Sequence, residues 1–185
     1  MLFRSNTLKS AGLAARMYTN DSDYLPQAEW LGGGNMMRWV RQLGSYSGVV
    51  SAQGTIAYDI ADMQKHPVFA CPSESTLDRI YGITNYAWNI WLGGLADPNT
   101  MYYLNEAQLH SPSATVMLYD SPMPTTTTLE DLYWKNMYYH SNGAAAALAL
   151  VPERHGKNSN VLFADGHVEL GSRASLHNEN IDPLQ

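Results

Sequence analysis

Apolar residues recur at three- and four-residue spacing along the first twenty positions of the chain. Leu8, Leu13 and Met17 mark this repeat, and no proline occurs before Pro26. Such spacing places apolar side chains along one side of a helix. We therefore predict a helix from Leu2 to about Thr19, ended by turn-forming side chains in the run Asn20-Asp21-Ser22-Asp23.

A second helix is predicted from Asn35 to about Leu43, after a flexible connector of three glycines at 32–34. Asn35 suits the N-cap position, because its side chain can accept a hydrogen bond from the first helical turn. The buried stripe of this helix would consist of Met36, Trp39, Val40 and Leu43.

Beyond Gly44 the pattern changes to short aromatic and β-branched runs separated by Gly, Pro, Ser, Asn and Asp. This punctuation is typical of an antiparallel sheet. Strands are predicted at Thr84–Trp91 and Thr115–Tyr119, whereas Ala144–Leu150 could form a short helix or a strand. The expected class is α+β: one domain over residues 1–185, with a long N-terminal helix on an antiparallel sheet of about four strands and a loop-rich insert between about 44 and 110.

A hairpin is predicted near the C-terminus, where the apolar run 161–164 is followed by Asp165-Gly166 and then by 167–170. Asp-Gly favours a two-residue type I′ turn, in which both central residues have positive φ. His167 and Glu169 would then lie on a solvated face. The opposite, apolar face would carry Val161, Phe163, Val168 and Leu170.

Composition limits the possible functions. The 185 residues are 45% hydrophobic and 15% charged, which suits a folded domain. The formal net charge is −6 and the eleven Lys and Arg are scattered, so we expect no nucleic-acid partner. The lone Cys71 cannot form an internal disulfide, and its position after an apolar run predicts a small buried residue.

The sequence shows no enzyme motif. The glycines at 32–34 lack the context of a phosphate loop, and neither Gly-x-Ser-x-Gly nor His-Glu-x-x-His occurs. Asp120 and Asp165 could be considered as a general acid and a general base, but nothing in the sequence indicates that the two carboxylates lie close together in the fold. For Cys71 to act as a nucleophile, a general base would have to lie within hydrogen-bonding distance of its thiol. We expect no enzymatic activity and no catalytic residue.

Metal chemistry is conceivable around the hairpin, because imidazole and carboxylate groups bind zinc. The candidate ligands are His155, Asp165, His167 and Glu169. A structural role explains them as well, since Asp165 and Gly166 form the turn and His155 could bond the hairpin backbone or Asp165. Calcium could use oxygen donors of the insert, although their spacing is not that of a calcium loop: Asp97, Asn99, Asn105 and Glu106. We expect a structural motif of His155, Asp165 and Gly166, with no metal or cofactor.

Five segments, in the order in which they follow one another along the chain, resemble segments of a known protein family. The last is His155, nine residues and Asp165-Gly166, and the earlier ones are Ser5–Pro26, Phe69–Ser73, Thr84–Asn89 and Ser111–Asp120. Together they resemble a bacterial pilin-like family, related to the pseudopilins of type II secretion. Its members begin with a prepilin-type cleavage and methylation signal and end with this His-to-Asp-Gly element.

The resemblance implies a structural subunit of a type II secretion pseudopilus or of a type IV pilus-like surface filament. Residues 1–20 would be the remnant of a spine helix that packs against other pilin-like subunits. The precursor would be anchored in the inner membrane, and the head would meet the secretion machinery and lie in the periplasm, at the cell surface or outside the cell.

The chain contains neither a leader ending in Gly-Phe nor the run of about 20 apolar residues that spans a membrane. The resemblance implies that Met1 follows a removed membrane helix. The alternative is a protein that never had a membrane segment. Codons upstream of Met1 would separate these two possibilities.

A second hypothesis is a secreted or surface-anchored module that binds carbohydrate or another ligand. A stacking platform could be formed by aromatic residues, although packing in the core and at interfaces is the simpler account of them. These residues are Trp88, Trp91, Tyr102, Tyr103, Trp134, Tyr138 and Tyr139.

Overall fold

The computed structural model of the chain describes residues 3–27, 29–32, 35–48, 68, 71, 86–97, 100–120, 155–172, 174–177 and 180. Its helices are α1 (Phe3–Ser22) and α2 (Trp39–Gly44), with short 3₁₀ helices η1 (Ser45–Ser47), η3 (Ile90–Leu92) and η4 (Glu106–Gln108). Its strands are β1 (Glu29–Gly32), β2 (Asn35–Arg38), β3 (Tyr86–Trp88), β4 (Gly93–Asp97), β5 (Thr100–Tyr103), β6 (Val116–Asp120), β7 (Ser159–Phe163) and β8 (Val168–Gly171).

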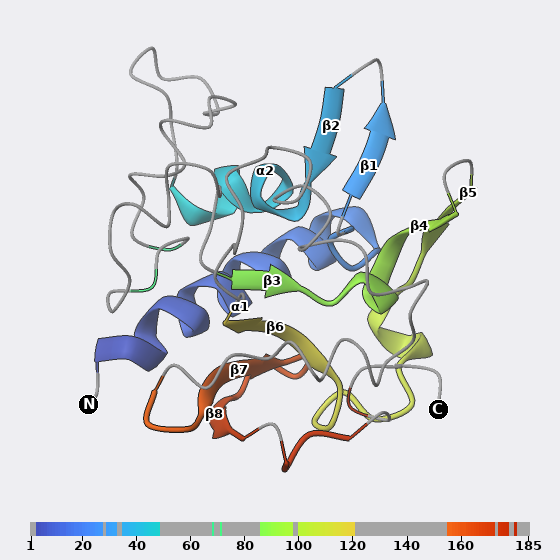
Figure 1. The fold of residues 1–185 in the computed structure, drawn as a ribbon. Helices are drawn as coiled ribbons and strands as arrows, with labels where there is room; N and C mark the ends of the chain where they lie inside the picture. Colours follow the sequence, from blue (N-terminus) through green and yellow to red (C-terminus); the bar gives the residue numbers. More distant parts are fainter. Residues whose placement is uncertain are drawn as a thin grey trace, which may run out of the picture.

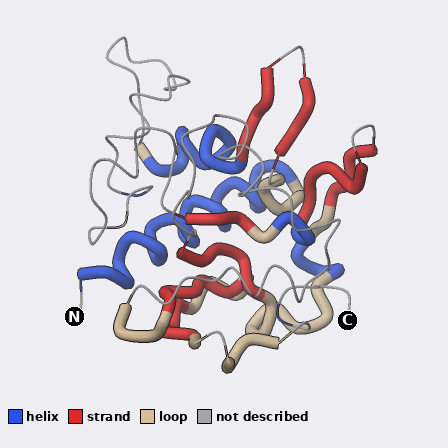
Figure 2. The backbone as a smooth tube through the Cα atoms, in the orientation of Figure 1, coloured by secondary structure: helices blue, strands red, loops and turns tan. Residues whose placement is uncertain are grey.

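The main sheet has four antiparallel strands in the order β3-β6-β7-β8, and two hairpins, β1-β2 and β4-β5, are separate from it (Figure 2). The predicted α+β class is confirmed, with a long N-terminal helix and a four-stranded antiparallel sheet. The predicted strand at Thr115–Tyr119 corresponds to β6, and the predicted C-terminal hairpin corresponds to β7 and β8.

Helix α1 crosses the molecule between α2 and the sheet (Figure 1). Its sheet-facing side is built from small residues and one leucine, all of them buried: Leu8, Ala11, Ala14 and Ala15. Gly12 belongs to the same side, and a Cβ atom added there would lie 2.9 Å from Leu162 Cδ1 of β7. The small side chains therefore bring the helix backbone close to the sheet.

The other face of the sheet is also covered. A second apolar cluster lies there, formed by Ala87, Val116, Tyr119, Val161, Phe163 and Leu176. All five residues of β7 are buried in consequence. This central strand therefore separates two apolar layers, and each layer fixes alternate side chains of β7.

The predicted second helix is wrong in its first half. Asn35–Arg38 forms strand β2, which pairs with β1 in register Glu29 with Arg38 and Gly32 with Asn35. Only Trp39–Gly44 is helical, and its Trp39 and Leu43 are buried as expected. Pairing with a neighbouring strand outweighs the weak helical preference of a four-residue stretch.

The hairpin forms, but its predicted register is wrong by one residue. Leu162 pairs with Val168, and Phe163 N–H donates to His167 O, so the loop has three residues rather than two. Gly166 has a φ of 92°, whereas Asp165 has no positive φ and cannot share a type I′ turn. The faces change accordingly: His167 and Glu169 lie on the side of Val161 and Phe163.

Several predictions lie outside the described residues. They concern the apolar run 144–150, the start of the strand predicted from Thr84, and the aromatic residues Trp134, Tyr138 and Tyr139. Among the described residues, no helix combines the length and the apolar character needed to cross a membrane.

Candidate functional site

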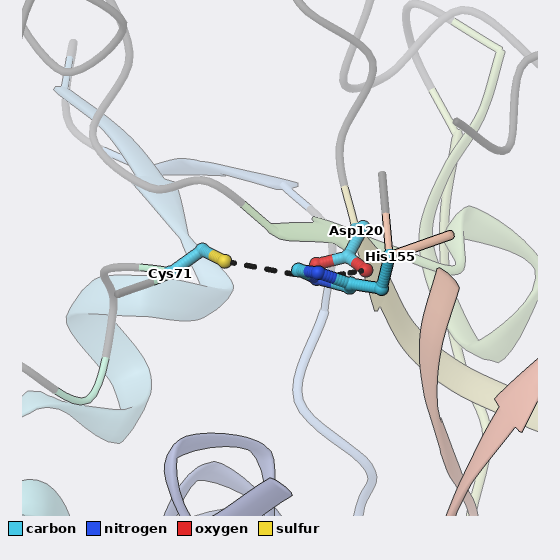
Figure 3. A group of neighbouring side chains, drawn as sticks. All are labelled: Cys71, Asp120 and His155. Atoms are coloured by element: carbon cyan, nitrogen blue, oxygen red, sulfur yellow. Dashed lines mark hydrogen bonds and ion pairs between the residues drawn. The ribbon is translucent and has the colours of Figure 1, made fainter. Parts of the chain in front are cut away.

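Three buried side chains from distant parts of the chain meet beside the main sheet (Figure 3). His155 Nε2 lies 3.2 Å from Asp120 Oδ2 and 3.9 Å from Cys71 Sγ. The potential ligand atoms of the three residues all lie within 4.8 Å of one another. We refer to Cys71, Asp120 and His155 as the buried cluster.

A tight turn positions His155. The next two residues, Gly156 and Lys157, have φ angles of 66° and 73°, and His155 N–H donates to Asn158 O at 2.8 Å. Two consecutive positive φ angles are the requirement of a type I′ turn. This turn lies at the start of β7, at the end opposite to the Asp165-Gly166 loop, and it holds the imidazole over the sheet.

Asp120 ends strand β6 and is fully buried. Its Oδ2 atom accepts hydrogen bonds from Asn160 N–H at 2.6 Å and from Asn160 Nδ2 at 3.3 Å. A buried carboxylate requires such donors, because the loss of hydration would otherwise be very costly. The first residues of β7 thus fix the direction in which this carboxylate points.

Tyr86 of β3 borders the buried cluster. Burial raises the pKa of its phenol, and the nearby groups of Cys71 and Asp120 raise it further. Thr7 of α1 has the opposite, lowering effect. The phenol is therefore neutral at physiological pH and can serve as a hydrogen-bond donor beside the sulfur.

The geometry of the buried cluster differs from that of a nucleophile–histidine–acid triad. In such a triad the nucleophile and the acid contact opposite nitrogens of the imidazole ring. Here Cys71 Sγ and Asp120 Oδ2 both approach Nε2. A thiol, an imidazole nitrogen and a carboxylate oxygen around one point form a donor set suited to a transition-metal ion.

The four hairpin residues proposed as metal ligands do not come together. His155 lies in the buried cluster, at one end of β7, and bonds Asp120 rather than Asp165. Asp165 and His167 lie at the other end, and Glu169 lies on β8 opposite Val161.

Asp165 and His167 form an exposed pair. Asp165 Oδ1 accepts from His167 N–H at 3.0 Å and lies 2.6 Å from its Nδ1. Burial works to raise the pKa of Asp165, but the two hydrogen bonds from His167 and the charges of His167 and Arg16 outweigh it and hold the pKa below its usual range. The His167 ring stacks on Phe163, with ring centroids 4.3 Å apart. These contacts explain both residues as parts of the hairpin.

Two of the residues considered for calcium have other partners. Asn105 caps η4, where its side chain accepts from Gln108 N–H, and Glu106 lies 3.5 Å from the Arg16 guanidinium. Asn99 and the side chain of Asp97 lie outside the described residues.

The described aromatic residues are distributed between core and surface. Trp88 is buried and stacks on Trp39 with ring centroids 5.4 Å apart, and Trp91 is half-buried. Tyr103 is exposed and contacts Tyr24. Trp88 therefore serves the core and is not available to a ligand at the surface.

Sequence reasoning did not link Cys71 or Asp120 to His155. The only available signal was indirect: three of the five segments that carry the family resemblance each supply one residue of the buried cluster. No spacing rule for metal ligands connects positions so far apart, because only the tertiary fold brings them together.

Comparison of the chain with protein-family models, curated proteins and solved structures gave no match.

Proposed function

We propose that the chain is the head of a pilin-like filament subunit, part of a type II secretion pseudopilus or a type IV pilus-like surface filament. The observation that carries the proposal is the two-sided character of α1. One side packs on the sheet through small residues, and the other side exposes the apolar residues Leu13 and Met17, at 64% and 45%.

Leu13 and Met17 are four residues apart, so they are neighbours on the surface of the helix. Exposed apolar groups on a helix that is already packed on its own sheet are available for contact with a second copy. Lys9 and Arg16, which are also exposed, border this stripe and give the contact a polar rim. We call Leu13 and Met17 the outer stripe of α1.

The five-segment resemblance supports the same proposal. It implies that α1 continues an apolar helix that anchors the precursor in the inner membrane until a peptidase trims it. Helices of neighbouring subunits then pack into a spine, and the heads are displayed in the periplasm or at the cell surface, in contact with the secretion machinery. The work of such a protein is assembly, driven by burial of apolar helix surface.

The test begins with the codons upstream of Met1. We expect a basic leader ending in Gly, followed by Phe and about 20 apolar residues. Expressed with a prepilin peptidase, the complete precursor should be cleaved and should assemble into filaments visible by electron microscopy. An upstream sequence without such a leader, or a precursor that the peptidase leaves intact, would overturn the proposal.

A matched pair of variants tests the outer stripe in that precursor. Leu13→Asp with Met17→Asp should abolish filaments while the head keeps its circular dichroism spectrum. Ser113→Asp, a charge added at an exposed polar position outside α1, should leave filaments intact. Equal loss in both variants would show that added charge, rather than the outer stripe, is responsible.

A further inference from the structure

We propose that Cys71, Asp120 and His155 bind a divalent transition-metal ion, zinc in the first place. This site differs from the hairpin group of His167 and Glu169 that the sequence suggested. It is also independent of filament assembly, since none of the three residues lies on the outer stripe of α1.

The distances within the buried cluster are close to those of a tetrahedral zinc site. Zinc–ligand bonds of about 2.0–2.3 Å in a tetrahedral site place the ligand atoms about 3.3–3.6 Å apart. In the buried cluster Nε2 is 3.2 Å from the Asp120 oxygen and 3.9 Å from the Cys71 sulfur, close to this range on either side. Both partners face the same ring nitrogen, as they must when that nitrogen and its neighbours share one ion.

The burial of two potentially anionic side chains also favours a bound cation. Asp120 and Cys71 are both 0% exposed. A carboxylate and a thiolate in such a place carry a large desolvation penalty unless a cation compensates them. A divalent ion bound by these two anions and a neutral imidazole would give a site with no net charge.

The hydrogen bonds around the buried cluster are those expected for a metal ligand. Asn160 donates two hydrogen bonds to Asp120 Oδ2, the oxygen that faces His155. Outer donors of this kind fix the direction of a coordinating oxygen. The supporting hydrogen bonds of the site therefore come from β7.

The kinds of ligand atom in the buried cluster indicate which metal ion it would bind. A thiolate and an imidazole favour zinc and related ions, whereas calcium and magnesium require oxygen donors only. Three protein ligands leave one position of a tetrahedral ion for a further donor. Because the ligands come from three distant segments, binding would join them and stabilise the fold.

The experiment uses the full 185-residue chain. It is equilibrated with zinc sulfate, separated from unbound metal by gel filtration and analysed by mass spectrometry for metal content. We expect one zinc per chain and a higher melting temperature with zinc than with EDTA. Cobalt(II) in place of zinc should give the visible absorption of a tetrahedral ion and a near-ultraviolet sulfur-to-cobalt band, a signature that reports Cys71 directly.

Variants locate the site. Cys71→Ser and His155→Gln should each weaken zinc binding more than about 100-fold, since loss of an outer partner alone costs about 10- to 100-fold. His167→Gln, which changes the exposed histidine of the hairpin, is the matched control and should keep one zinc per chain.

A folded wild-type chain that binds far less than one zinc, or that gives no sulfur-to-cobalt band, would overturn the proposal. So would zinc that is retained in Cys71→Ser and lost in His167→Gln. The cobalt spectrum needs no variant, so it decides the question even if Cys71→Ser fails to fold. If the metal-free structural motif expected from the sequence is correct, the chain would bind no zinc, its melting temperature would be the same with zinc and with EDTA, and cobalt would give no sulfur-to-cobalt band.

Discussion

Gly12 of α1 lies directly against Leu162 of β7, so closely that a Cβ atom on the glycine would come within 2.9 Å of the leucine Cδ1 atom. Leu162 is fully buried and belongs to the cluster that also contains Leu8 and Ala15. The leucine therefore has little room to withdraw from a larger neighbour. This contact sets the distance between the helix and the sheet.

Gly12→Val should destabilise the protein by about 1–3 kcal/mol, because the new side chain overpacks a full core. Urea unfolding followed by circular dichroism measures the change. Ser10→Val places the same β-branched side chain at an exposed position of the helix and should stay within about 0.5 kcal/mol of the wild type. Similar losses in the two variants would attribute the effect to helix propensity instead.

His155→Ala should lower stability by about 1.5–3 kcal/mol, because it removes a hydrogen-bonding partner from the buried carboxylate of Asp120. The measurement is urea unfolding in the presence of EDTA, so that metal does not contribute. His167→Ala, which breaks only an exposed pair, should cost less than about 1 kcal/mol.

Coupling between His155 and Asp120 is tested by a double-mutant cycle. The double variant His155→Ala with Asp120→Ala should be more stable than the sum of the two single losses predicts, by about 1–3 kcal/mol. Strictly additive losses would show that the 3.2 Å contact contributes nothing to stability.

Low pH should destabilise the protein through protonation of Asp165 in the hairpin loop. The pKa of this carboxyl is held below its usual range, so its contribution to stability is complete above the unfolded-state pKa of about 4 and is lost as the pH falls through the folded-state pKa. Asp165→Asn should therefore show a shallower fall in urea-measured stability below about pH 4 than the wild type.

His167 and Arg16 both lower the pKa of Asp165, and variants of the two residues should differ in how much they reduce the acid dependence of stability. His167→Gln should reduce the acid dependence more than Arg16→Gln, because the side-chain hydrogen bond and the charge of His167, which this change removes, each contribute more to the shift than the charge of Arg16. The opposite ranking would mean that the guanidinium, rather than the imidazole, controls this carboxyl.

The 185-residue chain should be monomeric or weakly dimeric and should not form filaments. The outer stripe of α1 is small, and specific interfaces usually bury at least about 1,200 Å². Sedimentation velocity over a concentration series measures the association, and Leu13→Asp should remove any dimer. Regular fibres formed by this chain would show that the head alone carries the assembly information.

The sequence predicted α1, β6 and the C-terminal hairpin, because each rests on a local pattern. Helical spacing of apolar residues and a run ending in Asp-Gly act within a few positions and persist in the fold. The register of the hairpin was missed because Asp165 bonds the His167 backbone and so favours a three-residue loop.

The buried cluster could not be predicted in the same way. Strand order brings Asp120 and His155 together, since β6 pairs with β7 although these strands are far apart in sequence, and Cys71 joins them from a segment outside the described strands. Sequence reasoning considered His155 with its neighbours along the chain and Cys71 alone. A residue's partners across a sheet do not follow from its neighbours in sequence.

The nine residues between His155 and Asp165 correspond to one strand together with parts of the turns at its two ends. Strand β7 alone spans about 17 Å. The length of this interval therefore determines where its two ends lie. The imidazole of His155 is in the interior at one end of β7, and at the other end Asp165 O of the Asp-Gly loop accepts a hydrogen bond from Arg16. Insertion or deletion of a single residue would turn one of these ends to the opposite face of the sheet.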